Sequence, residues 1–288
     1  MTLRRVMRKS ALLSRVNSYR VRRHTRIIEE LLSYSPNSAA PAEVLSRLAI
    51  QSVRQSVALM YELSETTASF TPLNPEAFQT SIWDGDNHDN PIRQAETLTH
   101  ALSEALEKFG SDKSTVHNYH LVYAAILGTL PSAAAILEFG LGTNNEDVPS
   151  TMGRNGRPGA SLRAWHAVLP DAQVLGADID KRILFDEPHI STFHADQTDD
   201  ASMAHLLTRL PEKLDLIIDD GLHSPNANLR VLLLGLRLVT VGGWIVIEDI
   251  RPSADQLWAV IARLVPAGYR WWYVRARAGD MFVVRRLA

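Results

Sequence analysis

Two pairs of carboxylates and one histidine have the types and spacing to do chemistry in this sequence. Asp219 and Asp220 end one apolar run, Glu248 and Asp249 end another, and His223 follows the first pair after a glycine. Neighbouring strands lie about 4.8 Å apart, so up to four negative charges would share one cleft. Like charges raise one another's pKa and resist burial. The cluster therefore needs a compensating cation.

A divalent metal ion is the compensation that we predict. No lysine or arginine lies beside either acidic pair in the sequence except Arg251. Carboxylate oxygens with an imidazole nearby suit Mg²⁺ or a similar hard ion. We expect Asp220, Glu248 and Asp249 to hold it. A neutral His223 is then placed to take a proton from a substrate hydroxyl. The alternatives are that one pair faces away as a helix cap, and that the histidine is an ordinary loop residue.

A glycine turn follows an earlier apolar run. Residues 134–145 read AAILEFGLGTNN, a short buried strand that leads into Gly140 and Gly142. Such glycines let backbone N–H groups approach a ligand. Glu138 lies at the strand's end, where a cationic group can meet it. The third glycine of a dinucleotide fingerprint is replaced by Asn145, and no P-loop lysine follows. A nucleoside or nucleotide therefore fits better than a pyrophosphate.

Strands and helices alternate from residue 134 onward, which is typical of a parallel sheet covered on both faces. The expected strands are Ala134–Phe139, Gln173–Ile179, Ile190–Ala195, Leu214–Asp219 and Gly243–Glu248. The helical patterns are Ser161–Leu169, Ala201–Leu210, Ala227–Leu238 and Ala254–Val265. Two final strand-like runs, Tyr269–Arg277 and Asp280–Leu287, meet at a glycine turn that indicates a hairpin. The predicted fold is α/β, a Rossmann-like sheet that ends in an antiparallel strand.

Ligands of open α/β sheets bind outside the carboxyl ends of the strands. Asp178 ends the second expected strand and is placed to accept both hydroxyls of a ribose. Asp196 and Gln197 follow the third and can meet an adenine amino group. Each acid, like Asp180 nearby, can instead serve only as a helix N-cap.

Residues 1–110 are predicted to form a helical accessory region, and residues 111–288 the sheet domain. Apolar residues recur at helical spacing in Leu3–Leu32, from Pro41 to Met60 and in Pro91–Phe109. Residues 71–90 are expected to be a loop, in which alternating Asp84, Asp86 and His88 either hold a cation or are simply solvated. Ser111 begins a loop that feeds a helix ending near Leu130.

Composition sets further bounds. The 288 residues include 45% hydrophobic ones, enough for a sizeable core, and have a net charge of -2. There is no cysteine, which excludes disulfides, cysteine-ligated zinc and thiol chemistry. No apolar run is long enough to cross a bilayer. Nothing argues for secretion, and we expect a cytoplasmic protein.

The N-terminal segment is strongly basic. Residues 1–30 hold nine lysines and arginines against two acids. A nucleic-acid arm, a membrane-surface helix or a transit peptide are open interpretations. We favour a solvated or oligomer-facing helix, because one basic helix without stacking aromatics is weak support for nucleic-acid binding.

Five motifs, in order, resemble those of the class I S-adenosylmethionine (SAM) methyltransferases. They are EFGLGTNN, GADID, ADQT, IDDGLHS and GGWIVIEDI. Within that class, DDGxH followed by ED after the next strand is similar to the metal-dependent O-methyltransferases of macrolide sugars, the mycinamicin and macrocin type. The segment SDKSTVHNYHLVY also resembles that group. The resemblance covers Ser111 to Ala288, and the closing antiparallel strand agrees with it better than with nicotinamide-dependent dehydrogenases.

The resemblance implies SAM and Mg²⁺ as cofactors, with His223 as general base and Asp220, Glu248 and Asp249 as metal ligands. The predicted cofactor-binding residues are Glu138, Gly140, Gly142, Thr143, Asp178, Asp196, Gln197 and Asp219. The expected reaction is methyl transfer to a hydroxyl of a small molecule, a sugar or another natural product, by a homo-oligomer. A catechol-like diol satisfies the same chelation. A metal-independent methyltransferase, a nicotinamide-dependent oxidoreductase and a non-enzymatic binding module remain alternatives.

Overall fold

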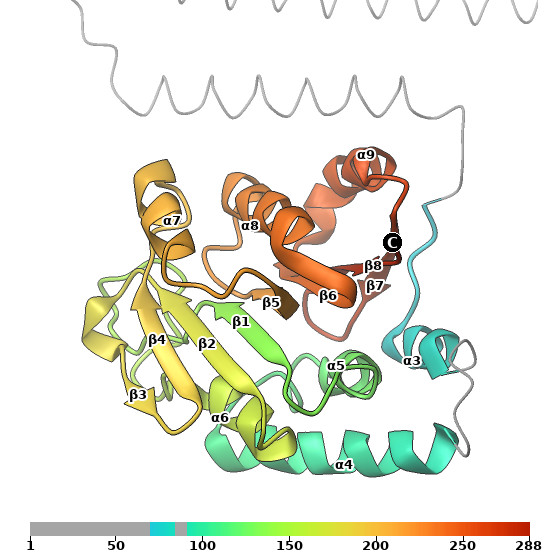
Figure 1. The fold of residues 1–288 in the computed structure, drawn as a ribbon, viewed down its shortest axis with the longest axis horizontal. Helices are drawn as coiled ribbons and strands as arrows, with labels where there is room; N and C mark the ends of the chain where they lie inside the picture. The colour runs from blue at the N-terminus through green and yellow to red at the C-terminus, as the bar shows by residue number, and fades with distance from the viewer. Residues whose placement is uncertain (1–69, 84–90) are drawn as a thin grey trace, which may run out of the picture. The chain divides into compact units, whose positions relative to one another are not determined.

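The computed structural model describes residues 70–83 and 91–288 (Figure 1). The helices predicted before Phe70 and the alternating Asp84, Asp86 and His88 lie outside the described residues. No helix in the described part of the chain is long and apolar enough to cross a bilayer. The division into a helical region of residues 1–110 and a sheet domain of residues 111–288 stays a prediction.

One mixed sheet organises the described chain, in the order β3-β4-β2-β1-β5-β6-β8-β7. Strands β4, β2, β1, β5 and β6 run parallel, and β8 pairs antiparallel with both β6 and β7. The predicted α/β fold, a Rossmann-like sheet that ends in an antiparallel strand, is confirmed. The strands are β1 (Ala135–Phe139), β2 (Gln173–Asp178), β3 (Asp186–Glu187), β4 (Ile190–His194), β5 (Leu214–Asp219), β6 (Val239–Ile250), β7 (Tyr269–Arg275) and β8 (Asp280–Arg286).

Helices cover both faces of the sheet, with α4, α5 and α6 on one side and α7 and α8 on the other (Figure 1). Their bounds are α3 Pro75–Trp83, α4 Pro91–Phe109, α5 His120–Leu127, α6 Ala160–Val168, α7 Asp200–Leu207, α8 Pro225–Leu238 and α9 Asp255–Leu264. Two short 3₁₀ turns, Lys181–Ile183 and Pro252–Ala254, complete the elements. The strands are short and apolar because both of their faces are buried.

Side chains of each strand alternate between two hydrophobic clusters. In β5, Leu216 and Ile218 join the cluster that contains α5 and α6, whereas Ile217 joins the cluster that contains α8 and α9. In β1, Ile136 and Leu137 divide in the same way. This two-residue period decides which face each strand-end acid meets, because the same alternation continues to the end of the strand.

The expectation of a loop over residues 71–90 is wrong for its first half, where α3 forms. Asn74 caps this helix, since its side-chain Oδ1 accepts a hydrogen bond from Ala77 N at 2.7 Å. Pro75 stands at the helix start, where its missing N–H costs nothing. Phe78 is fully buried, with its ring centroid 5.5 Å from that of Trp272. Asn-Pro is therefore a helix-start signal here, and tertiary packing stabilises this short helix.

Replacing Phe78 tests whether α3 belongs to the core. Phe78→Ala should lower the free energy of unfolding by about 3 to 5 kcal/mol, because it leaves a cavity beside two tryptophans. Leu264→Ala, at a residue 73% exposed on α9, is the matched control and should change it by less than about 0.5 kcal/mol. Denaturant unfolding of the full chain measures both. Equal effects would show that α3 does not contribute to the core.

Candidate functional site

A cavity opens at the carboxyl ends of the parallel strands. The predicted residues that line it are Gly140, Gly142, Thr143, Asp178, Asp196, Gln197, Asp220, His223, Glu248 and Asp249. Glu138 and Asp219 are fully buried and are not part of the lining. The strand ends therefore bring most of the predicted residues to one place, as expected for parallel strands.

Backbone contact holds the glycine turn against the segment that follows β5. Gly140 has a φ of 88°, and a Cβ on it would lie 2.0 Å from the carbonyl oxygen of Asp220. The Asp220 N–H also donates to the carbonyl of Phe139 at 2.9 Å. Glycine is required here by this close approach as well as by its φ. The turn after β1 and the acid after β5 are thus joined directly.

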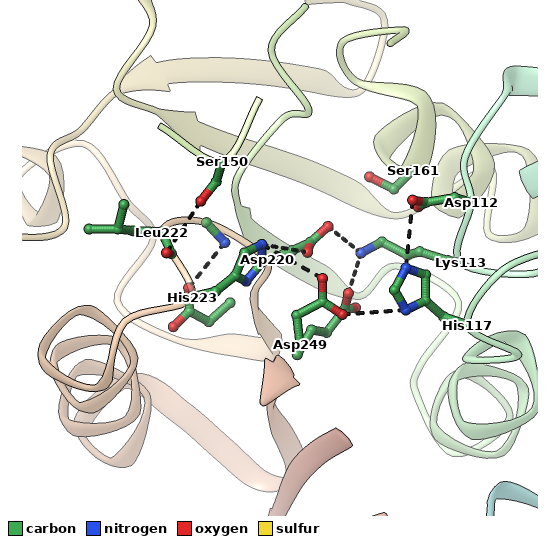
Figure 2. Close-up of polar contacts among 12 residues, drawn as sticks. Asp112, Lys113, His117, Ser150, Ser161, Asp220, Leu222, His223 and Asp249 are labelled. Atoms are coloured by element: carbon green, nitrogen blue, oxygen red, sulfur yellow. Dashed lines mark hydrogen bonds and ion pairs between the residues drawn. The ribbon is translucent and has the colours of Figure 1, made fainter. Parts of the chain in front are cut away.

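Lys113 supplies a cation that the sequence analysis missed. Its ammonium lies 2.6 Å from Asp220 Oδ2 and 2.6 Å from Glu248 Oε2 (Figure 2). It also lies 3.4 Å from Glu138 Oε1. The lysine is buried, and it comes from the segment that precedes α5. The acidic pairs do have a basic partner, although it is distant in sequence. A metal ion is therefore not the only cation that compensates these acids, contrary to the prediction.

Two of the strand-end glutamates have their side chains occupied by protein partners. Glu138 accepts hydrogen bonds from Ser161 Oγ at 2.8 Å and from Trp165 Nε1 at 2.6 Å, both on α6. Glu248 accepts from the Tyr123 hydroxyl on α5 and from Lys113. Both glutamates point to the face of the sheet that carries α5 and α6.

Burial and these contacts shift the pKa values of Glu138, Glu248 and Lys113. Burial raises the pKa of Glu138 and of Glu248 above the ordinary value, and the neighbouring ammonium of Lys113 opposes that rise. Burial also lowers the pKa of Lys113, but the charges of Asp220, Glu248 and Glu138 outweigh it and raise the pKa well above its usual range. The lysine is therefore protonated at neutral pH.

A second, outer group lies nearer to the mouth of the cavity. Asp220, His223 and Asp249 offer ligand atoms that all lie within 4.8 Å of one another. The side chains of the two aspartates are 27% and 28% exposed. His223 Nε2 lies 3.9 Å from Asp220 Oδ1 and 3.7 Å from Asp249 Oδ2 (Figure 2). The spacing suits a hard cation with carboxylate ligands and open positions.

Unusual backbone conformations position two members of this outer group. His223 and Asp249 both have a φ of 53°, in the left-handed region that non-glycine residues rarely adopt. At Asp249 this turn coincides with a register shift between β6 and β8. The Tyr119 hydroxyl donates to Asp249 Oδ1 at 2.7 Å and helps to hold the turned residue. Strain of this kind is common at functional sites.

Asp178 and Asp180 have different roles, since one faces the cavity and the other caps a turn. Asp178 lines the cavity, and its oxygens accept from Leu141 N at 2.7 Å and from Asp180 N at 2.8 Å. Asp180 caps the following turn through Arg182 N and binds the Thr143 hydroxyl at 2.6 Å. The bond to the Arg182 side chain holds the pKa of Asp180 well below its usual range. Asp178 is the acid that faces the cavity.

Gln197 and Asp219 form a buried support for the segment that carries His223. Gln197 Nε2 donates to Asp219 Oδ1 at 2.5 Å, and Gln197 Oε1 accepts from Leu222 N at 3.0 Å. Asp219 also accepts from Asn228 Nδ2 on α8 at 2.9 Å. Asp196 remains at the lining, where Oδ1 accepts from Thr198 N at 2.8 Å. The Asp219 side chain therefore supports the site from within the protein.

The segment of residues 111–119 contributes further residues that sequence reasoning did not select. Asp112, Lys113 and His117 line the cavity. His117 Nδ1 lies 3.4 Å from Asp249 Oδ1 and also contacts the Ala278 carbonyl at the hairpin turn. The motif SDKSTVHNYHLVY, which resembles a segment of the macrolide-sugar O-methyltransferases, is the signal in the sequence that could have identified these residues.

Comparisons with known proteins point to natural-product methyltransferases. No protein-family model matches the chain. It is 29% identical over 147 residues to the 8-demethyl-8-alpha-L-rhamnosyl tetracenomycin-C 2'-O-methyltransferase of Streptomyces olivaceus. It is 30% identical over 92 residues to a 3'-O-methyltransferase of the same organism that acts on the 2-methoxy-rhamnosyl tetracenomycin. These matches cover 51% and 32% of this chain, which spans only 36% and 23% of the two relatives.

Solved structures of low sequence identity share the fold. Two crystal forms of MycE, a methyltransferase from the mycinamycin biosynthetic pathway in complex with Mg and SAH, align with TM-scores of 0.50 and 0.51. Their identities to this chain are 22% and 21%. Each alignment covers 65% of this chain and about half of the MycE chain, 54% and 53%. The likeness establishes the fold of the sheet domain.

The contact at Gly140 leads to a prediction about stability. Gly140→Ala should destabilise the chain by at least about 2 kcal/mol more than Gly242→Ala, because only the first places a Cβ against a backbone carbonyl. Gly242 has a similar φ of 86° with nothing within 4 Å, so its variant isolates the backbone strain. Denaturant unfolding compares them. Equal losses would show that the turn after β1 relaxes away from Asp220.

Proposed function

We propose that the chain is a SAM-dependent O-methyltransferase that uses a divalent cation to methylate a hydroxyl of a small molecule. The observation that carries the proposal is the outer group of Asp220, His223 and Asp249, within 4.8 Å, beside the glycine turn at the strand ends. The sheet topology and the two tetracenomycin relatives support the reaction class.

The cofactor is assigned to the half of the cavity that follows β1, β2 and β4. Gly140, Gly142 and Thr143 line it without bulky side chains, and Asp178 faces it as the acceptor for ribose hydroxyls. Asp196 is placed for the adenine amino group. Gln197, Glu138 and Asp219 belong to this assignment as supports, since their side chains are bound to protein partners.

The acids fit a divalent cation at the outer side of the cluster. Asp220 Oδ1 and Asp249 Oδ2 face His223 rather than Lys113, and oxygen donors of this kind suit Mg²⁺. Glu248, the third predicted ligand, is 1% exposed and already paired with Lys113 and Tyr123. In this proposal Glu248 coordinates the ion only after its contact with the Lys113 ammonium has broken.

His223 is proposed as the base that removes the acceptor's proton. The bound ion lowers the pKa of an acceptor hydroxyl, and SAM supplies an activated methyl group. The protein mainly has to orient the acceptor for in-line attack. His223 Nε2 lies 3.9 Å from Asp220 Oδ1 and 3.7 Å from Asp249 Oδ2, so a proton acceptor stands at the edge of the proposed ion site. Ring Nδ1 has no hydrogen-bond partner among the described residues, so this histidine does not depend on a third relay group there.

The substrate class follows the relatives. Both curated relatives act on a rhamnosyl group of tetracenomycin, and we propose a glycosylated natural product as acceptor here. A sugar offers neighbouring hydroxyls that chelate an ion in the same way as a diol. We further propose a homo-oligomer in the cytoplasm, with residues 1–110 as the accessory region.

A metal-independent methyltransferase is the second candidate, and Lys113 favours it. The ammonium already neutralises part of the acid cluster, so an ion is not required by charge alone. In that case the acids hold the base and the acceptor directly. Dependence on metal separates the two candidates.

Replacing His223 tests the base. His223→Ala should lower turnover at least about 100-fold, the usual contribution of a general base, while SAM affinity stays within about twofold. His223→Asn is the second variant, because asparagine tolerates the positive φ at this position. Methyl transfer from labelled SAM to a panel of α-L-rhamnosides measures turnover, and calorimetry measures SAM binding.

The exposed His205 on α7 provides the control for that experiment, since His205→Ala should keep wild-type turnover. If both His223 variants also kept it, the assignment of the base would be wrong.

Removing the metal tests the cation. Excess EDTA should abolish methyl transfer, and added Mg²⁺ should restore it, because the proposed ion acidifies the acceptor hydroxyl. EDTA saturated with Mg²⁺ beforehand is the control for the chelator itself. Full activity in excess EDTA would favour the metal-independent candidate.

A further inference from the structure

Lys113 contacts the same carboxylates to which a metal ion is assigned. Its ammonium lies 2.6 Å from both Asp220 Oδ2 and Glu248 Oε2, with its side chain 3% exposed (Figure 2). A buried ammonium at these distances takes lone pairs that a metal ion would also use. Lysine and ion are thus rivals for Glu248, whereas Asp220 presents Oδ2 to the lysine and Oδ1 to the proposed ion.

The carboxylates have supports that do not involve the lysine. Glu248 accepts a hydrogen bond from the Tyr123 hydroxyl. Asp249 accepts one from the Tyr119 hydroxyl at 2.7 Å. The backbone of Asp220 is held against the turn after β1 through its N–H bond to Phe139. Removing Lys113 therefore takes away a charge and a competitor without freeing the acids from their positions.

We infer that Lys113 is the resident cation of the acid cluster, which a divalent ion must displace from Glu248, and that it thereby sets the affinity of the site for the ion. The inference rests on the proposed metal-dependent function and adds a regulator of that site. Lys113 keeps the buried acids compensated while no ion is bound, at the cost of weaker ion binding. If Lys113 instead preorganised the ligands for the ion, removing its charge would weaken ion binding.

Lys113→Met tests the inference, since methionine keeps much of the side chain's length and removes the charge. The full-chain variant should bind Mn²⁺ about tenfold more tightly than the wild type, because a repelling unit charge next to the ion is gone. Electron paramagnetic resonance of free Mn²⁺ measures the affinity, and calorimetry with Mg²⁺ repeats it. The matched control is Lys213→Met, which removes an exposed lysine at the opposite end of β5 and should leave the affinity unchanged.

The outcomes separate this inference from the proposed function. If the wild type binds Mn²⁺ and Lys113→Met binds it equally tightly or more weakly, the inference is overturned and the metal-dependent function still stands. Binding by neither protein overturns both. Binding by the variant alone supports the inference.

The wild-type protein provides a second test if the variant does not fold. A crystal structure with Mn²⁺ bound should show Lys113 Nζ withdrawn from Glu248. An ion bound at the site with the 2.6 Å contact between Lys113 Nζ and Glu248 intact would overturn the inference.

Discussion

The contact between one buried ammonium and three carboxylates is the constraint on which the rest of this site depends. Strands β1, β5 and β6 each bring an acid to the same edge of the sheet, and an uncompensated cluster would resist burial. Lys113 joins Glu138, Asp220 and Glu248 and so ties the segment before α5 to three strand ends. The same segment brings His117 and Tyr119 to Asp249. One side of the cavity is thereby closed by residues that precede the sheet in sequence.

The fold could be predicted from the sequence because its signals are local. Apolar runs that alternate with helical patterns indicate a parallel sheet, and the glycine between the last two runs indicates the hairpin that reverses β8. The errors concern elements that depend on distant contacts. Helix α3 forms where Phe78 packs beside Trp272. Strand β6 extends beyond the predicted Gly243–Glu248 to Val239–Ile250, because Val239 pairs with Leu214 of β5 and Ile250 pairs with Asp280 of β8. None of these partners can be identified from the segment itself.

The site was predictable in its position and less so in its side-chain directions. Strand ends place the acids together, but alternation along each strand sends Glu138 toward Trp165 on α6 and Asp219 toward Asn228 on α8. The two-residue alternation can be read from the sequence, but the helix that covers each face of the sheet cannot. Lys113 was missed for a related reason, because it is 107 residues from Asp220 and 135 from Glu248. A search for compensating charge near the acids in sequence does not reach it.

The close approach of Gly140 to the Asp220 carbonyl limits which parts of the cavity can change through substitution. Two main-chain segments in van der Waals contact set the distance between the part of the cavity lined by Gly140 and the part lined by Asp220. Side-chain substitution does not change a distance set by main-chain contact, so the width of the cavity varies only through the side chains of its lining. There, Met152 is 44% exposed, and Ser150 bridges to the Leu222 carbonyl at 3.3 Å. The main-chain contact and the variable side chains of the lining thereby belong to different parts of the chain, and substitutions in the second leave the first unchanged.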